Sequence, residues 1–545
     1  MLKILNLISF ISAPFLTAIL LILSFPRYDY HSLAWIAYVP LLLAIRNRKP
    51  WQSFFVGWLC GFVFFVCVSP WVRNFPGINK FSGSLGYLYL SLYFGLFCLF
   101  LTVILRRTRL PILIAAPILV SFEYARCNFF FLAFPTILLG HTQYLNLPLI
   151  QIASFSGAYG ISFILMLANA AIADLIAYWI GKRKKGAPLG INISPVFSGA
   201  IILAMILVLW VAGYISLRPT FSGKSFTIAV IQGNIPQELK WDREYREQIL
   251  TQYENLTEEA GKNQPQLIVW PEASTPGFVL SDRSLLQRMA SVVRRVNTYL
   301  LAGSAEYPKF GKGKITLKSG NTALFFSPEG NVIGQYLKIR LVPFGEYVPW
   351  EETIPWPDFI VSKKKINFHI SGNEFTLFGI EETNFGALIC WEVLFPDLSR
   401  SFVRKGADFL INLSNEAWFG KSDVPYQILS FSVFRAVENR INLVRCTNTG
   451  ISCFVDPYGR IMDRVTNGNE DIFVAGTLTK EILIPPAGTF YTRYGDVFAF
   501  GCIVLSIGLL IGSFFAKSLF SELPRSKLRG IKFSKKLSSP LMGED

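Results

Sequence analysis

Long apolar segments are the feature that most constrains this chain. Seven of them precede residue 220 and an eighth lies near 494–516, and each approaches the ~20 residues that a membrane-spanning helix needs. The first seven lie near residues 5–25, 31–45, 52–72, 86–105, 110–125, 158–180 and 196–217. The chain is 52% hydrophobic and only 16% charged, against about 25% charged residues in soluble proteins. The sequence therefore predicts a multi-span α-helical membrane domain with about eight spans.

Basic residues gather in the loops on one side of these predicted spans. The loops after the second, fourth and sixth spans hold ten Lys and Arg residues, whereas the alternate short loops hold four. Because short cytoplasmic loops carry the excess of Lys and Arg, we expect both termini in the cytoplasm and residues 219–492 outside it. This bias also accounts for much of the net charge of +16, so we expect no nucleic-acid partner.

The region 219–492 has a different sequence pattern from the apolar segments. Its short β-rich runs are FTIAVI, QLIVWP, YLLAGS, FGALICW, DFLINL and IFVAGTL, and its polar helical stretches are 243–262, 284–297 and 425–440. Such an alternation predicts an α/β or layered β-sandwich domain with its own core. We therefore expect four parts: a membrane domain at 1–218, an extracytoplasmic catalytic domain at 219–492, a C-terminal transmembrane helix at 493–516 and a basic cytoplasmic tail at 517–545.

Cys390 stands at the end of the apolar run FGALICWE. Taken alone, a thiol at the end of a strand is more often a core group than a nucleophile. A nucleophilic cysteine needs a base or a nearby cation to form its thiolate. The three histidines offer little, since His31 and His141 fall at membrane segments and His369 lies in a loop without a supporting motif. If Cys390 is catalytic, a carboxylate is the better candidate for its base.

Two other stretches supply the missing groups. In LIVWPEASTP a strand ends at Glu272, and burial there would raise the pKa of the carboxyl toward the range in which it can accept and return a thiol proton. YLKIRLVPFGEYVPW contains Lys338 and, eight residues on, Glu346. An ammonium beside the thiol favours the thiolate and stabilises an oxyanion. The amide N–H of Trp391 is a candidate for a second oxyanion donor.

Three short motifs resemble the nitrilase, or carbon–nitrogen hydrolase, superfamily: WPE with Glu272, YxK with Lys338, and CWE with Cys390, in the matching order and approximate spacing. That superfamily uses a Glu-Lys-Cys triad on amides and nitriles or for acyl transfer, and its fold is an α-β-β-α sandwich. A domain of this kind between seven preceding spans and one following span resembles the bacterial apolipoprotein N-acyltransferase family. Further stretches that resemble that family are QGNIPQELKW, LVPFGEYVP, SNEAWFG, RCTNTGISCFVDPYG and FEYAR.

The resemblance implies roles for residues of this chain by position. Glu272 would be the general base and acid, Lys338 the oxyanion stabiliser and Cys390 the nucleophile. Four accessory or substrate-binding positions are implied as well: Glu346, Glu392, Trp241 and Trp391. Structural salt bridges would explain the two glutamates nearly as well, and packing alone would explain Trp241.

The resemblance also implies a reaction, its partners and a location. It implies transfer of an acyl chain from a phospholipid, through a cysteine thioester, to the α-amine of a diacylglyceryl-cysteine at the N-terminus of an apolipoprotein. It implies a multi-pass protein of the bacterial inner membrane with its catalytic domain on the periplasmic side, and no metal or organic cofactor. The alternatives are a membrane-tethered amidase that hydrolyses carbon–nitrogen bonds, and a non-catalytic membrane sensor.

Three smaller features stay open at this stage. Cys446 and Cys453 could pair outside the cytoplasm, although we expect buried free thiols. The aromatic stretch at 349–359 is either a lid that dips into the bilayer or an ordinary loop. Arg126 and His141 are candidates for contact with lipid headgroups, and snorkelling at a helix end explains Arg126 equally well.

Overall fold

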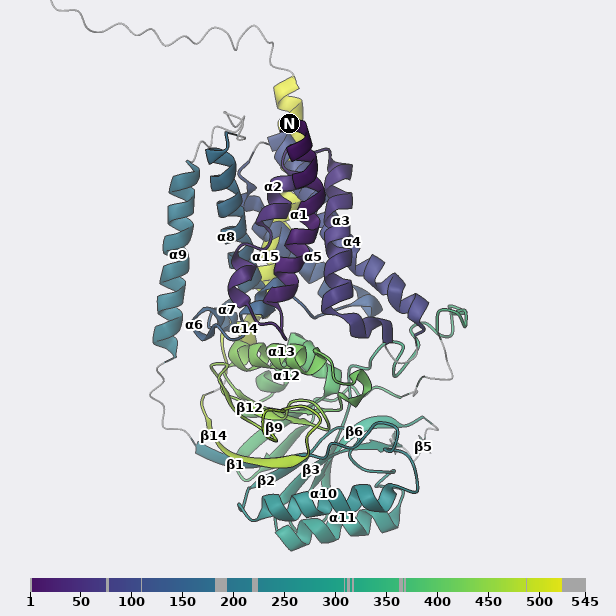
Figure 1. Ribbon diagram of the computed structural model, residues 1–545. Coiled ribbons are helices and arrows are strands. Elements are labelled where there is room, and N and C mark those ends of the chain that lie inside the picture. Colours follow the sequence, from purple (N-terminus) through teal and green to yellow (C-terminus); the bar gives the residue numbers. More distant parts are fainter. Residues whose placement is uncertain are drawn as a thin grey trace, which may run out of the picture.

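The computed structural model has a helical bundle at one end and a β-sandwich at the other (Figure 1). It describes residues 2–74, 78–108, 110–181, 194–217, 224–307, 309–310, 314–315, 318–361, 366, 369–486 and 488–521. Some of the basic residues counted above therefore lie outside the described residues. They are Arg109 in the loop after the fourth predicted span, residues 182–185 after the sixth, and most of the tail 517–545.

The bundle is built from two separate stretches of chain. Its helices are α1 (Leu2–Ser24), α2 (Val39–Ile45), α3 (Pro50–Val68), α4 (Lys80–Thr108), α5 (Ala115–Asn128), α6 (Leu147–Ile150), α7 (Ala153–Ser156), α8 (Ala158–Trp179), α9 (Pro195–Ser216), α14 (Phe490–Tyr494) and α15 (Val497–Ser521). Among the described residues, α3, α4, α8, α9 and α15 are long and apolar enough to cross a membrane. Helix α15 packs on α4 and α5, so the C-terminal segment completes the bundle.

The second and fifth predicted spans differ from single long helices. The segment near 31–45 forms a 3-10 helix, His31–Trp35, and then α2, which has a proline in its first turn. The seven residues of α2 rise only about 10 Å at 1.5 Å per residue. Helix α5 has 14 residues and rises about 21 Å, against a hydrocarbon core of ~30 Å. Apolar composition does not mark such breaks in a helix.

The second part of the chain forms two six-stranded sheets that pack face to face. The first has the order β14-β1-β2-β3-β6-β7 and the second β13-β12-β11-β10-β9-β8. The strands are β1 (Lys224–Gln232), β2 (Leu267–Trp270), β3 (Tyr299–Glu306), β6 (Gly320–Phe326), β7 (Val332–Leu337), β8 (Leu377–Ile380), β9 (Thr383–Ile389), β10 (Phe409–Ser414), β11 (Asn442–Thr447), β12 (Cys453–Val455), β13 (Ile461–Arg464) and β14 (Gly476–Ile484). A separate hairpin pairs β4 (Lys309–Phe310) with β5 (Lys314–Ile315).

Alternation along β1 shows how the sandwich forms its layers. Ile228 and Val230 join the core between the two sheets, whereas Ala229 and Ile231 join a second core beneath the outer helices. This is the period-2 pattern of a strand buried on both faces. Helices α10 (Arg246–Gly261) and α11 (Arg283–Val296) cover the first sheet, and α12 (Pro396–Arg404) and α13 (Val424–Asn439) cover the second (Figure 1). The predicted α-β-β-α sandwich is confirmed.

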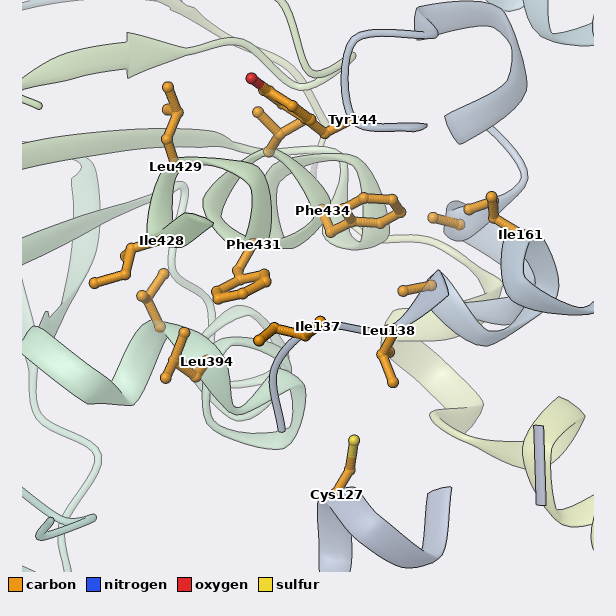
Figure 2. Packing of buried hydrophobic residues seen from close by; sticks show 14 of the residues in the cluster. Cys127, Ile137, Leu138, Tyr144, Ile161, Leu394, Ile428, Leu429, Phe431 and Phe434 are labelled. Carbon is orange, nitrogen blue, oxygen red and sulfur yellow. The ribbon is translucent and has the colours of Figure 1, made fainter. Parts of the chain in front are cut away.

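The layer of α12 and α13 lies between the second sheet and the bundle (Figure 1). Figure 2 shows Phe431 and Phe434 of α13 beside Ile137 and Leu138, which belong to the chain between α5 and α8. The ring of His141 packs on both phenylalanine rings, with centroids 4.6 and 5.1 Å away. The buried His141 ring is thus part of an apolar junction between the two halves of the molecule and does not face the lipid headgroups.

Arg126 is also buried at this junction rather than extended toward solvent. Its guanidinium donates to the carbonyl oxygens of Phe134, Thr136 and Ile137 at 3.3, 2.8 and 3.1 Å. These bonds fix the chain after α5 against the end of that helix. Arg126 therefore holds backbone next to the sandwich, and neither headgroup contact nor snorkelling describes its position.

Candidate active site

Cys390 follows β9 at the point where that strand turns into a 3-10 helix, Cys390–Leu394. Its φ of +53° lies in the left-handed region, which is strained for a residue with a Cβ and occurs mostly at functional sites. The residues before it on β9 are buried between strands β8 and β10. The turn takes the thiol out of the strand and into a cavity.

Glu272 follows β2 in the opposite sheet and lies beside Cys390 because the two sheets pack face to face. Its side chain is nearly buried, with the residue 7% exposed. One carboxylate oxygen accepts a hydrogen bond from the Asn321 side-chain amide at 2.6 Å, and the other accepts from the Asn415 backbone N–H at 2.8 Å. These two bonds fix the direction in which the carboxylate points.

Lys338 is fully buried next to β7 and lies between two carboxylates. Its Nζ donates to Glu346 Oε1 at 2.7 Å and lies 3.8 Å from Glu272 Oε1. Burial alone would lower the pKa of Lys338, but Glu346 and Glu272 together raise it above its ordinary value. Burial likewise opposes ionisation of Glu346, yet Lys338 lowers the pKa of that carboxyl. The site therefore holds a permanent ammonium.

The Cys390 thiol is protonated at rest. Burial raises its pKa above the ordinary value of a cysteine, the negative charge of Glu272 and its hydrogen bond to the thiol raise it further, and Lys338 opposes them. A thiol in this state reacts only when a neighbouring base removes its proton as it attacks. Glu272 is placed for that step.

Glu392 lies behind the site and does not line its cavity. Its carboxylate accepts from the backbone N–H groups of Ile339, Arg340 and Ile389 at 2.7, 3.0 and 2.7 Å. The Tyr336 hydroxyl lies 2.9 Å from both of its oxygens. Glu392 thus joins the segment after Lys338 to the strand that carries Cys390, and burial raises the pKa of its carboxyl.

The cavity around these groups has an empty volume of about 1140 Å³, including solvent at its mouth. Its floor holds Cys390, Glu272 and Lys338, and its wall holds Trp71 and Thr136 from the bundle. The other apolar and aromatic groups that line it are Trp241, Ala273, Val342, Trp391, Leu394, Trp418, Phe419, Val424, Ile428 and Phe431. Both halves of the molecule therefore build one cavity, with ionisable groups at its floor and many apolar and aromatic side chains on its wall.

Hydrogen bonds tie the two halves together at this wall. The Trp71 indole donates to Gln427 Oε1 at 3.3 Å, and Gln427 Nε2 donates to the Val68 carbonyl at 2.7 Å. The Trp71 ring also stacks on Phe134 and meets Trp391 edge-on, with centroids 5.7 and 6.3 Å away. The aromatic wall is a fixed part of the fold.

Two relatives of this chain from different bacteria have the same name. Its sequence is 36% identical over 516 residues to an apolipoprotein N-acyltransferase of Geobacter metallireducens, covering 93% of this chain and 96% of the relative. This chain belongs to the apolipoprotein N-acyltransferase family. A relative of the same name from Haemophilus influenzae is 28% identical over 496 residues, covering 88% of this chain and 90% of the relative.

Two family profiles divide the chain in the same way as the structure. The apolipoprotein N-acyltransferase N-terminal domain matches residues 17–171, and the carbon-nitrogen hydrolase family matches residues 227–481. A solved structure of an amidase from Nesterenkonia sp. is 15% identical, covers 52% of this chain and 97% of its own, and has a TM-score of 0.37. From its relatives and family profiles, the chain is a multi-pass N-acyltransferase homologue with a carbon-nitrogen hydrolase domain.

The structure brings together most of the residues predicted for an N-acyltransferase site. Glu272, Lys338, Cys390, Glu346, Trp391 and Trp241 all line the cavity. Trp241 is 48% exposed, with its ring 6.5 Å from that of Phe278. Cys446 and Cys453 are free and buried, as expected. Among the described residues no cluster of three His, Cys, Asp or Glu could hold a metal ion.

Sequence reasoning did not place in the cavity seven polar residues that line it in this family member: Thr136, Gln237, Lys240, Asn321, His369, Asn415 and Gln427. Lys240 and Asn415 lie inside motifs recognised for the family, but nothing in those motifs showed which side chains point inward. Asn321 and Thr322 are polar residues at the start of β6, before its apolar run, and give only a weak local signal. His369 packs against Ser319 and donates its backbone N–H to the Glu346 carbonyl at 2.8 Å, and burial lowers the pKa of its imidazole.

The stretch 349–359 lies against the bundle near the cavity. Trp350 and Phe359 are both more than half exposed, and the Trp350 ring lies 4.7 Å from that of Phe131. Asn79 also contacts the Phe359 carbonyl through its side-chain amide. These contacts make the stretch an ordered loop that presents aromatic side chains beside the bundle, where Trp is favoured at a membrane interface.

Proposed function

We propose that this chain N-acylates apolipoproteins with a Glu272–Lys338–Cys390 triad on the periplasmic side of the bacterial inner membrane. Glu272 removes the thiol proton of Cys390 as its sulfur attacks an ester carbonyl of a phospholipid. Lys338 and backbone amides, with that of Trp391 among them, hold the oxyanion. Glu272 returns the proton to the departing oxygen, a lysophospholipid leaves, and the acyl group remains on Cys390 as a thioester.

The second half-reaction transfers the acyl group from Cys390 to the acceptor. The free α-amine of a diacylglyceryl-cysteine, at the N-terminus of an apolipoprotein, attacks the thioester carbonyl. Glu272 takes the proton from the attacking nitrogen and gives it to the departing Cys390 sulfur. An amide forms, the carbon–sulfur bond breaks, and the site returns to its starting state.

The two-sided cavity is the observation that supports this proposal. A soluble amidase needs only a polar floor with the triad, whereas here the bundle contributes Trp71 and Thr136 to the wall beside the thiol. An acyl chain attached to Cys390 would find apolar side chains directly next to its thioester. The excess of Lys and Arg in alternate loops of the sequence supports a periplasmic position for the sandwich, and the proposed domain limits are 1–218, 219–492, 493–516 and 517–545.

Intact mass spectrometry of the purified full-length protein tests the proposal. After mixing with phospholipid we expect one acyl adduct on Cys390 that is stable in water for the time of the assay. A lipopeptide with a free diacylglyceryl-cysteine amine should discharge it with formation of the N-acyl product, and an N-acetylated lipopeptide should not. Rapid loss of the adduct without an amine would instead identify a hydrolase, and full lipoprotein N-acylation by Cys390→Ala would rule out the thioester.

A further inference from the structure

Lys240 is a second buried lysine in the catalytic cavity and has no part in the steps above. It ends the turn after β1, is 2% exposed, and lines the cavity with Glu272 and Cys390. Its Nζ donates to the backbone carbonyl of Glu272 at 2.9 Å. Within the described part of the chain, no carboxylate oxygen forms an ion pair with this ammonium. Its other N–H donors are therefore available to a ligand.

The two lysines of the cavity differ in their counter-ions. Lys338 lies between Glu346 and Glu272, which neutralise it and raise its pKa. The Lys240 ammonium contacts only a neutral carbonyl, and burial lowers its pKa to about 8 although the nearby charge of Glu272 opposes that shift. A buried cation without a counter-ion is costly, so an anionic ligand at this wall would be stabilising.

The other ionisable groups of the cavity do not supply this anion. Glu346 is paired with Lys338, and the carboxylate of Glu272 is bonded to Asn321 and to a backbone N–H. Cys390 is a protonated thiol, and His369 has a pKa lowered by burial, so it is neutral. Among the described side chains, Lys240 therefore has no carboxylate in direct contact, and Glu272 acts on it only through its nearby charge.

We infer that Lys240 binds the anionic phosphodiester of the donor lipid, so that the turn at 235–241 forms a phosphate subsite. The inference rests on the proposed function, in which the donor is a phospholipid. In such a lipid the reacting ester and the phosphodiester share one glycerol, so both must enter the same cavity. Gln237 and the exposed Trp241 lie on the same turn and line the same cavity.

The subsite also fits the order of the two half-reactions. The phosphodiester leaves with the lysophospholipid, so Lys240 is again without an anion when the acceptor arrives. The Lys240 ammonium then disfavours a protonated, cationic α-amine nearby and favours the neutral form that attacks the thioester. One lysine thereby favours an anionic donor in the first half and an uncharged amine in the second.

Two donors with the same acyl esters test the inference. Dipalmitoylphosphatidylglycerol carries the phosphodiester, and dipalmitoylglycerol lacks it. Single-turnover acylation of Cys390 is measured for each donor in detergent micelles, with the full-length protein, Lys240→Met and Lys240→Gln. Lys262→Met, at the exposed C-terminal end of α10, is the matched control.

We expect both Lys240 variants to raise the half-saturating concentration of the phosphatidylglycerol about tenfold, the size expected when a hydrogen bond to a charged group is lost. The half-saturating concentration of dipalmitoylglycerol should change less than twofold. Lys262→Met should change the half-saturating concentration of neither donor. In the unmodified protein, the half-saturating concentration of the phosphatidylglycerol should increase at pH values above 8, because Lys240 loses its proton there. The half-saturating concentration of dipalmitoylglycerol should stay constant over the same pH range.

An equal loss with both donors would overturn the inference and make Lys240 a residue that only positions Glu272. An unchanged half-saturating concentration of the phosphatidylglycerol in both Lys240 variants would overturn it as well. The pH comparison uses the unmodified protein, so it decides the question even if both variants misfold. If the unmodified protein forms no thioester with either lipid, the proposed function itself fails, which is a distinct result.

Discussion

The buried ion pair of Lys338 and Glu346 gives the sharpest test of the triad. Lys338→Met removes a fully buried ammonium that lies 2.7 Å from Glu346 and 3.8 Å from Glu272. Breaking such a pair leaves an uncompensated buried charge and costs about 3–5 kcal/mol, or roughly 10 °C in melting temperature for a domain of this size. We also expect the rate of Cys390 acylation to fall about 100- to 1000-fold, the cost of losing one oxyanion donor.

The double variant Lys338→Met/Glu346→Gln separates stability from catalysis. Because it removes both charges of the pair, we expect at least half of the lost melting temperature to return, while acylation stays as slow as in the single variant. Lys421→Met is the matched control, since its ion pair with Glu470 is more than half exposed and contributes about 0–1 kcal/mol. Melting in detergent and mass spectrometry of the thioester measure the two effects. A double variant that acylates within tenfold of the unmodified protein would refute the catalytic role of Lys338.

Three further predictions follow from the geometry of the site. Because its pKa is raised, Cys390 should be alkylated by iodoacetamide slowly at pH 7.5, with a rate still rising above pH 9; a plateau below pH 8 would indicate a standing thiolate. Gly303→Ala would place a methyl group against the Pro271 carbonyl oxygen and 2.7 Å from the Glu272 Cα, so acylation should fall at least about tenfold, whereas Gly379→Ala, with only a side-chain oxygen at 3.3 Å, should leave it unchanged. Glu392→Gln turns an acceptor of three backbone N–H groups partly into a donor and should lower the free energy of unfolding by about 3 kcal/mol; unchanged melting would contradict this anchoring role.

Much of the architecture could be predicted from hydrophobic patterning. The polar helical stretches expected at 243–262, 284–297 and 425–440 correspond to α10, α11 and α13. The run FGALICW forms β9, except that the strand ends before Cys390. The breaks within the second and fifth apolar segments could not be predicted, because a 3-10 turn and a long helix have the same apolar composition. Their geometry is set by packing in the bundle.

The site was predictable only where residue type and strand position coincide. Glu272 and Cys390 follow apolar strands, so their positions at strand ends could be expected from the sequence. Their contact depends on the packing of two separate sheets, which no local pattern specifies. Lys240 shows most clearly what the sequence alone cannot predict. The stretch QGNIPQELKW has the composition of a polar turn, and its lysine is nevertheless buried. Burial of that side chain results from the tertiary fold alone.

The bond between Trp71 and Gln427 has a consequence for engineering. Nitrilase-like domains are attractive as soluble catalysts, but here the sandwich is not a portable module. Excised at its strand boundaries, it would keep its triad and lose Trp71 and Thr136, the side chains that the bundle places at the cavity wall. A thioester formed in such a fragment would face bulk water on that side. Under the proposed mechanism, we expect such a fragment to lose its thioester to hydrolysis, because the part of the cavity wall that the bundle supplies is missing.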